Sequence, residues 1–307
     1  CYYIEVDKLR ERRLNGALSA VPSEKNFSFS KNTTYGCGGV ADLALFPRTE
    51  EEACKCFASL LKSGEKFFIL GAGSDVLACD GVYDGTIICT SQLNSFYEEE
   101  GQEGEVILNL SCGAAVSALL KLCRQKGYSG AEFLAGIPAS LGGIVYMNGG
   151  AGKYISECVD SVRIFDGKIR ELSNKECDFS YKHSTMRDIK CFILDVKLRL
   201  KRENPQIVRK KIEDALSARS HIPAGRSCGC VFENYCGVSA GKIFESAGLK
   251  GATFGKAYVS RDHANFIINE GERAEDVFRL IKYIKQEVYK KFGITLKEEV
   301  CYIGDFE

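Results

Sequence analysis

Two glycine-bearing stretches of this 307-residue chain have a composition suited to holding a cofactor. The first is the short run Gly71-Ala72-Gly73-Ser74, and the second is residues 133–152, where six glycines lie among apolar residues. Glycine permits positive φ and lets another group approach the backbone closely. We therefore expect the second stretch either to lie against a flat or phosphorylated cofactor or to form tight turns in a buried core.

The first stretch follows a short apolar run, residues 67–70, that is typical of a buried strand. A tight turn there directs successive backbone N–H groups into one concavity, which suits a phosphate oxygen. The run lacks the third glycine, at Val76, and the following helix of a dinucleotide-binding fingerprint. Asp80-Gly81 and Asp84-Gly85 are instead expected to interrupt the chain soon afterwards. Taken alone, the run is a weak indication of phosphate binding.

The fifteen cysteines are scattered singly in apolar surroundings, and only three histidines accompany them. No CxxC motif occurs, and the closest pairs are Cys54/Cys56 and Cys228/Cys230. This pattern predicts reduced, mostly buried thiols and no metal site. A thiol redox centre at residues 228–230 is a weaker hypothesis, because one intervening glycine is shorter than the usual CxxC spacing.

Composition excludes several function classes. The chain has 45% hydrophobic and 27% charged residues, with 41 basic and 41 acidic side chains. Such a balance gives no net attraction to nucleic acid or acidic membranes, and no apolar run is long enough to span a bilayer. The amino-terminal residues lack the apolar region of a secretory signal. We expect a cytoplasmic monomer that binds neither nucleic acid nor membranes.

The elements that must position these residues alternate between helical and strand patterns. Thr49 followed by three glutamates predicts a helix start, and Gly127 predicts the end of a helix that begins near Val116. Helices are also expected over residues 1–20, 206–220, 240–247 and 274–292, and strands over 86–90, 105–113, 161–166, 168–172, 192–200 and 258–270. The helix after Thr49 carries Leu61 on its expected apolar face. A change in sequence pattern near residue 204 predicts a domain boundary, with α+β structure on both sides.

Seven blocks of sequence, in order, resemble the UDP-N-acetylenolpyruvoylglucosamine reductase (MurB) family, in its shorter subtype. They are NTTYGCGG with ADL, LGAGSDVL with DGVYDG, EFLAGIPASLGGIVYMNGGAG, SYKHS, CGCVFEN with SAGKIFESAGLKG, VSRDHANFIIN and KEEVCYIG. The resemblance covers about residues 20–304. It implies an FAD-binding module of vanillyl-alcohol-oxidase type in two parts, residues 1–88 and 89–204. A substrate-binding α+β domain, residues 205–307, then follows.

The resemblance also implies an activity: NADPH-dependent reduction of UDP-N-acetylglucosamine enolpyruvate to UDP-N-acetylmuramate through bound FAD, in peptidoglycan precursor synthesis. An enol ether accepts hydride poorly unless its carboxylate can take up negative charge. Such a site therefore needs a cation or acid at the carboxylate and a proton donor at the α-carbon.

Three residues match the family's catalytic positions, two of them with a changed side chain. Glu299 matches a carboxyl near the carboxyl terminus. Lys182 stands where the family usually has arginine, so the charge is kept and the planar two-pronged grip is lost. Cys230 stands where the family usually has the proton-donating serine, and a thiol is a stronger acid than a hydroxyl. A solvated acid, a surface lysine and a buried cysteine are the competing interpretations.

The match further implies cofactor and substrate neighbours. Those on the cofactor are Gly71, Ala72, Gly73, Ser74, Asp75, Gly136, Ile137, Pro138, Ala139, Ser140, Gly142 and Gly143. Those near the substrate are Tyr181, Asn234, Lys250, His263 and Asn265, and Tyr35 and Asn148 are further neighbours of substrate or flavin. Asp75 replaces a usual asparagine and Glu233 a common lysine. These changes, with Lys182, motivate an alternative: a catalytically impaired FAD- or nucleotide-binding homologue with a scaffold or regulatory role.

Overall fold

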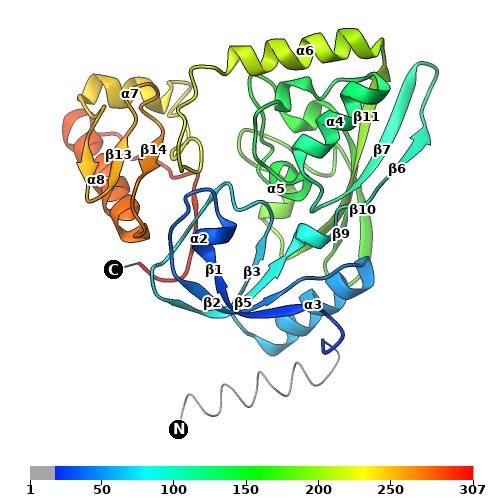
Figure 1. The fold of residues 1–307 in the computed structure, drawn as a ribbon, viewed down its shortest axis with the longest axis horizontal. Helices are drawn as coiled ribbons and strands as arrows, with labels where there is room; N and C mark the ends of the chain where they lie inside the picture. Colours follow the sequence, from blue (N-terminus) through cyan, green and yellow to red (C-terminus); the bar gives the residue numbers. More distant parts are fainter. Residues whose placement is uncertain (1–17, 307) are drawn as a thin grey trace. The chain divides into compact units, whose positions relative to one another are not determined.

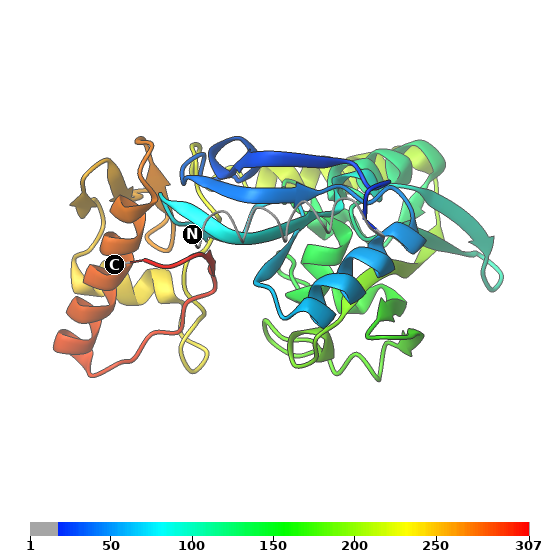
Figure 2. The same cartoon turned by 90° about the horizontal axis from the view of Figure 1, so that it is seen from below.

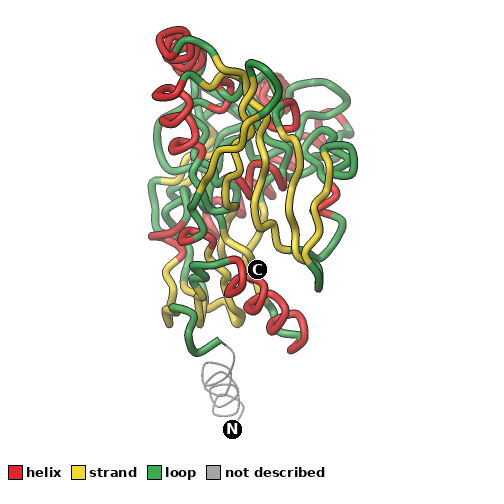
Figure 3. Tube along the Cα trace, turned by 90° about the vertical axis from the view of Figure 1, so that its right-hand side faces the viewer, coloured by secondary structure: helices red, strands yellow, loops and turns green. Residues whose placement is uncertain are grey.

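The computed structural model describes residues 18–306, so the helix expected over residues 1–20 lies almost wholly outside the described residues. Helices, strands and loops alternate along this part of the chain (Figure 3). Contacts group the chain into two compact units. Unit 1 comprises residues up to 25, 43–71 and 85–209, and unit 2 comprises residues 26–42, 72–84 and 210–307. The three-part division expected from the sequence stays a prediction.

The largest sheet belongs to unit 1 and has the strand order β10-β9-β11-β7-β6, with β8 also paired to β11. All its pairings are antiparallel. The strands are β6 (Phe96–Glu100), β7 (Glu105–Ser111), β8 (Tyr128–Ser129), β9 (Val159–Phe165), β10 (Ile169–Ser173) and β11 (Phe192–Arg202). Along β11, buried Val196, Leu198 and Leu200 alternate with the more exposed Lys197 and Arg199. The sheet therefore has one core face and one polar face.

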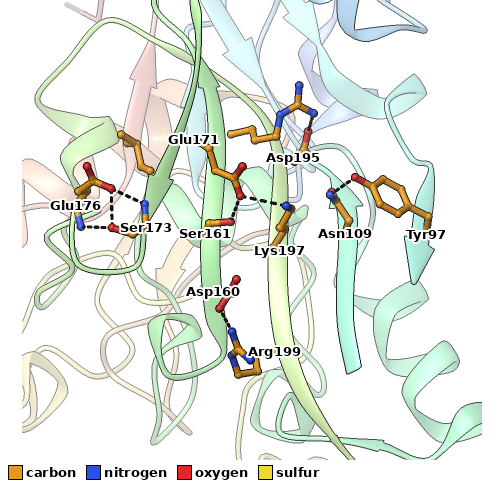
Figure 4. Close-up of polar contacts among 12 residues, drawn as sticks. Tyr97, Asn109, Asp160, Ser161, Glu171, Ser173, Glu176, Asp195, Lys197 and Arg199 are labelled. Carbon is orange, nitrogen blue, oxygen red and sulfur yellow. Dashed lines mark hydrogen bonds and ion pairs between the residues drawn. The ribbon is translucent and has the colours of Figure 1, made fainter. Parts of the chain in front are cut away.

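Ion pairs and hydrogen bonds link neighbouring strands across the polar face (Figure 4). Glu171 accepts from Ser161 at 2.6 Å and lies 3.2 Å from Lys197 Nζ, and Arg199 pairs with Asp160. These contacts join β9, β10 and β11 side by side. Each side chain has its partner within the face, as is typical of a solvated surface.

Two helices of unit 1 have the end signals that their sequences predict, whereas the short α5 (Leu141–Tyr146) was not expected. Thr49 Oγ1 caps α3 (Glu50–Ser63) by accepting from Glu52 N at 3.2 Å. Gly127, at φ +75°, ends α4 (Val116–Lys126) in the left-handed conformation. Figure 1 shows α4 and the short α5 (Leu141–Tyr146) beside β7 and β11. One detail is wrong: Leu61 is 38% exposed, because it lies at the edge of the buried stripe of α3.

A four-stranded sheet has the order β1-β2-β5-β3. Its strands are β1 (Ser23–Ser28), β2 (Val40–Leu45), β3 (Phe67–Leu70) and β5 (Val82–Cys89), and the unit boundaries fall within β1, β2 and β5. The expected interruption at Asp84-Gly85 is wrong, since β5 runs through both residues. Parallel pairing of Phe67 with Thr86 supplies ladder bonds that override the local turn preference.

Unit 2 has one sheet of β12 (Thr253–Phe254), β13 (Ala257–Val259) and β14 (Ile267–Asn269), and a parallel pair of β4 (Val76–Ala78) with β15 (Cys301–Ile303). Its helices are α2 (Phe29–Asn32), α7 (Ala240–Ala247), α8 (Ala274–Phe292) and most of α6 (Pro205–Ala218). Figure 2 shows the long α8, whose buried face includes Leu280, Ile281 and Ile284. The bounds of α6, α7 and α8 confirm the three helices expected in this region.

The single strand expected over residues 258–270 is divided into β13 and β14, which pair antiparallel. Ser260 Oγ accepts from Asp262 N at 3.1 Å and from His263 N at 3.3 Å. A serine hydroxyl that bonds backbone two and three residues onward stabilises a turn. This turn interrupts the strand that the apolar pattern alone predicts to be continuous.

Candidate functional site

The two glycine-bearing stretches meet in unit 1 at Gly71 and Ser140. A Cβ placed on Gly71 would lie 2.3 Å from Ser140 Oγ, so a larger residue would require the Ser140 hydroxyl to move. Ser140 in turn caps α5 by accepting from Gly143 N at 3.3 Å. Both stretches were expected to hold a cofactor, and the fold brings them into contact.

The second stretch is neither fully buried nor fully open. Gly142 is buried, where a Cβ would come within 2.9 Å of Cys112 Cβ, whereas Gly136, Pro138 and Gly143 are exposed. The packing interpretation is confirmed for Gly142, while the exposed glycines leave backbone at the surface, and their contact with a cofactor stays a prediction. Ile137 and Ala139 are half-buried beside them. A backbone surface with few side chains fits the flat ring and phosphates of a flavin dinucleotide.

The remaining residues of the first stretch belong to unit 2. Gly73, at φ +66°, accepts from Thr34 N at 2.9 Å, and a Cβ there would lie 2.2 Å from Asn32 O. Ala72 is exposed and Ser74 is half-buried. Asp75 O accepts from Cys301 N at 2.9 Å. The run therefore follows a fixed path. At position 73 only glycine fits both the left-handed backbone and the close approach of Asn32 O.

Tyr181 and Lys182 form the tip of a tight turn in unit 1. Ser180 and His183 exchange two backbone hydrogen bonds of 3.2 Å across it. Lys182 has φ +55°, a left-handed conformation that costs a residue with a side chain about 1–2 kcal/mol. Uncommon backbone of this kind is concentrated at functional sites.

The segment after the glycine-rich stretch holds this turn in place. Asn148 Nδ2 donates to Ser180 O at 2.8 Å, and Ser184 Oγ donates to Tyr146 O at 2.8 Å. Arg187 donates to Lys182 O, and its guanidinium lies 5.7 Å from the centre of the Tyr146 ring. The candidate flavin backbone and the candidate cation are thereby joined within one unit. Arg187 was missed, because a single arginine in a polar loop has no distinguishing pattern.

Cys230 lies on an extended segment of unit 2 between two others. Cys230 forms a bridge with Phe266, and Val231 N donates to Asn265 O at 3.0 Å. Glu299 N donates to Val231 O at 2.8 Å. The backbone thus brings Cys230 and Glu299, 69 positions apart in sequence, onto neighbouring segments.

Several candidate residues act electrostatically on the thiol of Cys228. Cys228 is fully buried, and burial raises the pKa of its thiol well above the ordinary value. Negative charge at Asp75, Glu299 and Cys230 raises that pKa further. Cys228 Sγ also donates to Tyr35 Oη at 3.3 Å. Sequence order alone did not indicate that Asp75 and Glu299 both affect Cys228.

Arg219, just after α6, is a cation that was not among the expected site residues. Burial lowers the pKa of Arg219, and negative charge on Cys230 acts in the opposite direction. The position of Arg219 at the end of a basic helix made it look like a surface residue.

The two neighbours of Glu299 have other partners. Lys297 Nζ lies 2.8 Å from Glu233, and Lys285 Nζ lies 2.7 Å from Glu298. Lys297 therefore supplies the charge compensation that the change to glutamate at position 233 had put in doubt. Glu299 is half-buried, which disfavours the interpretation as a solvated acid.

The expected substrate neighbours are dispersed over unit 2, apart from Tyr181. Asn234 Oδ1 accepts from Ala240 N at 3.1 Å, and Lys250 pairs with Glu245 at 2.5 Å on the surface. The His263 ring stacks on His221 with centroids 6.3 Å apart. Burial, and then the charge of His221, lowers the pKa of His263. Asn265 is buried, and its side chain bonds to protein backbone.

Within residues 18–306, no group of three or more His, Cys, Asp or Glu side chains could hold a metal ion. No helix in the same range is both long and apolar enough to cross a bilayer. The cysteines of this range are all free thiols.

Comparison with known proteins defines the class. Residues 41–173 match the family model described as FAD binding domain, and residues 220–303 match the UDP-N-acetylenolpyruvoylglucosamine reductase, C-terminal domain. The first match includes both glycine-bearing stretches, and the second includes Cys230 and Glu299. The chain is thus an α+β flavoprotein of the oxidoreductase class, with an FAD-binding module followed by a separate carboxyl-terminal region.

Full-length relatives identify the family. UDP-N-acetylenolpyruvoylglucosamine reductase of Caldicellulosiruptor saccharolyticus is 36% identical over 90% of this chain and 90% of its own length. The reductase of Borreliella burgdorferi is 36% identical over 95% of this chain and 99% of its own. The crystal structure of MurB from Thermus caldophilus superposes with a TM-score of 0.78 at 28% identity, covering 92% and 99% of the two chains. This chain belongs to the UDP-N-acetylenolpyruvoylglucosamine reductase family.

Proposed function

We propose that this chain reduces the enolpyruvyl ether of UDP-N-acetylglucosamine to UDP-N-acetylmuramate in an NADPH-dependent reaction. Bound FAD supplies the hydride that adds to the β-carbon. The Cys230 thiol gives its proton to the α-carbon, and Glu299 and Lys182 stabilise the charge that develops on the carboxylate. The saturated lactyl ether then contains one added hydride and one added proton.

The observation that carries this proposal is the backbone bond between Glu299 N and Val231 O. It sets a carboxyl group beside the segment of the proton donor, as reduction of an enol ether requires. The exposed backbone of Gly136, Pro138 and Gly143 would lie along the flavin, with Gly71, Ala72 and Ser74 on the phosphate side.

We also propose that the protein acts as a cytoplasmic monomer. Free thiols at every cysteine in residues 18–306 support a reducing compartment. Size-exclusion chromatography with light scattering would test the oligomeric state, and a mass near twice the chain mass would contradict the proposal.

The decisive test is anaerobic. Purified protein should be yellow, and its bound flavin should be reduced by NADPH and reoxidised when the enolpyruvyl sugar nucleotide is added. The product should be heavier than the substrate by two hydrogen atoms. Bound FAD without substrate-dependent reoxidation would contradict the proposed activity and favour the impaired homologue.

A further inference from the structure

The side chain of Asn265 is occupied by the backbone of a single residue in the Cys230 segment. Its Oδ1 accepts from Phe232 N at 3.0 Å, and its Nδ2 donates to Phe232 O at 2.8 Å. Asn265 is 4% exposed and Phe232 is 1% exposed. Both backbone groups are therefore satisfied by one amide in a place that solvent reaches poorly.

The same residue also bonds the segment through its main chain. Asn265 O accepts from Val231 N at 3.0 Å, next to the bridge between Cys230 and Phe266. Asn265 thus makes three hydrogen bonds to the two residues that follow Cys230. A segment held at two successive residues has a fixed backbone, which sets the direction of the Cα–Cβ bond of the residue that precedes them.

The segment is held on its other side by the carboxyl-terminal strand region. Glu299 N donates to Val231 O at 2.8 Å, and Lys297 O accepts from Glu233 N at 2.9 Å. Asn265 completes this arrangement by fixing Phe232, which lies between these two bonds. The direction of Cys230 relative to Glu299 therefore depends on an amide outside both residues.

We infer that Asn265 is a positioning residue, which sets the direction of the Cys230 thiol for proton delivery and does not act as a substrate ligand. The inference rests on the proposed reduction. Proton transfer needs donor and acceptor within hydrogen-bond reach, and small misplacements of a donor reduce rates steeply. Loss of the amide should slow the step that uses the proton and spare the step that does not.

The test separates the two half-reactions in stopped-flow experiments on the FAD-loaded protein. In Asn265→Ser, flavin reduction by NADPH should stay within about twofold of wild type, and reoxidation by the enolpyruvyl sugar should slow about 10-fold or more. The KM for the sugar nucleotide should change little. The control is Asn269→Ser, since buried Asn269 also bonds backbone, at Tyr35 O and Gly271 O, both at 3.1 Å.

Asn265→Asp gives a second, isosteric test. A protonated carboxyl can accept from Phe232 N and donate to Phe232 O, whereas an ionised one cannot donate. The reoxidation rate of Asn265→Asp, divided by that of wild type, should rise as pH is lowered from about 8 to about 5.5. Division by wild type removes the titration of His263, whose Nδ1 accepts from Asn265 N at 3.3 Å, and of the Cys230 and Glu299 side chains.

Hydrogen exchange on protein without substrate provides a readout other than activity. The Phe232 amide should exchange about 10-fold faster in Asn265→Ser and keep its wild-type rate in Asn269→Ser. Equal slowing of reoxidation in both serine variants, or a raised KM as the main effect of Asn265→Ser, would overturn the inference. Wild-type protein that is not reoxidised by the sugar at all would instead refute the proposed function.

Discussion

The two candidate catalytic segments are held by opposite kinds of backbone. In unit 2 the Cys230 segment is extended, and bonds from Asn265 and Glu299 satisfy it on both sides. In unit 1, Lys182 occupies the tip of a tight turn at φ +55°, a conformation that few lysines adopt. The candidate proton donor thus lies, half-buried, on an extended segment held by hydrogen bonds, and the candidate cation lies on strained backbone at an exposed turn.

The difference implies different tolerance to substitution. A buried ladder holds its side chain in one direction but depends on every hydrogen bond. A strained turn fixed by Asn148 and Arg187 holds the backbone, while the long lysine side chain remains adaptable. We therefore expect chemistry at position 230 to depend on geometry and chemistry at position 182 to depend mainly on charge.

The largest effect should come from removing the proton donor. Cys230→Ala should lower kcat about 10²–10⁴-fold, because a positioned general acid contributes a factor of this size. Cys230→Ser should retain turnover within about 10-fold of wild type, since a hydroxyl can be held in the same place. Steady-state NADPH oxidation with saturating sugar nucleotide measures both. Equal loss in the two variants would favour an obligatory thiol function and contradict simple proton delivery.

Removing the cation should have the next largest effect. Lys182→Met should lower kcat/KM for the sugar nucleotide about 10–100-fold, because a charge facing the developing carboxylate is lost. Lys182→Arg should equal or exceed wild type, since its planar fork restores the two-pronged grip. Flavin reduction by NADPH serves as the internal control. Full activity in Lys182→Met would show that Lys182 is a surface lysine with no role in the reaction.

The sequence predicted the fold class and the two candidate catalytic segments, but not the difference between their backbone conformations. Cap and periodicity signals such as Thr49, Gly127 and the apolar stripe of α8 gave the helix bounds, because these signals are local. The family resemblance predicted the α+β flavoprotein fold and nominated Cys230, Lys182 and Glu299. Their roles, and those of the other expected site residues, stay predictions.

What the sequence could not give depends on contacts between distant residues. The meeting of Gly71 with Ser140, and the joint effect of Asp75 and Glu299 on the pKa of Cys228, follow from tertiary packing. The amide of Asn265 was expected at the substrate, but in the structure it bonds to Phe232. A continuous strand over residues 258–270 was wrong for a local reason: the side chain of Ser260 stabilises a turn there.

Lys182→Gly should separate strain from charge. Glycine adopts positive φ without steric penalty, so this variant should raise the free energy of unfolding by up to about 1 kcal/mol while losing the activity that depends on charge. Lys182→Asn, which also tolerates the left-handed region, should have a smaller stabilising effect. Thermal unfolding monitored by circular dichroism measures the change. Destabilisation in both variants would show that the lysine side chain contributes contacts that outweigh the backbone strain.

The smallest effect concerns Asp195, on the polar face of the unit 1 sheet, where charged residues are frequent but no candidate catalytic residue lies. Burial raises the pKa of Asp195 to about 6, although Arg163 Nη1, 2.6 Å from its carboxylate, opposes the shift. The folded chain then binds more protons than the unfolded chain between about pH 4 and pH 6, so the free energy of unfolding falls as pH rises through this window.

In Asp195→Asn this fall should disappear. Relative to wild type, the free energy of unfolding of the variant should rise by on the order of 1 kcal/mol between pH 4 and pH 7. This is less than the full pKa shift implies, because solvent screens a group near the surface. Urea unfolding at several pH values measures it, and kcat should not change. A constant stability difference across the window would show that Arg163 compensates the carboxylate fully. A change in kcat would mean that this face contributes to the reaction, as we propose for the Lys182 turn and the Cys230 segment.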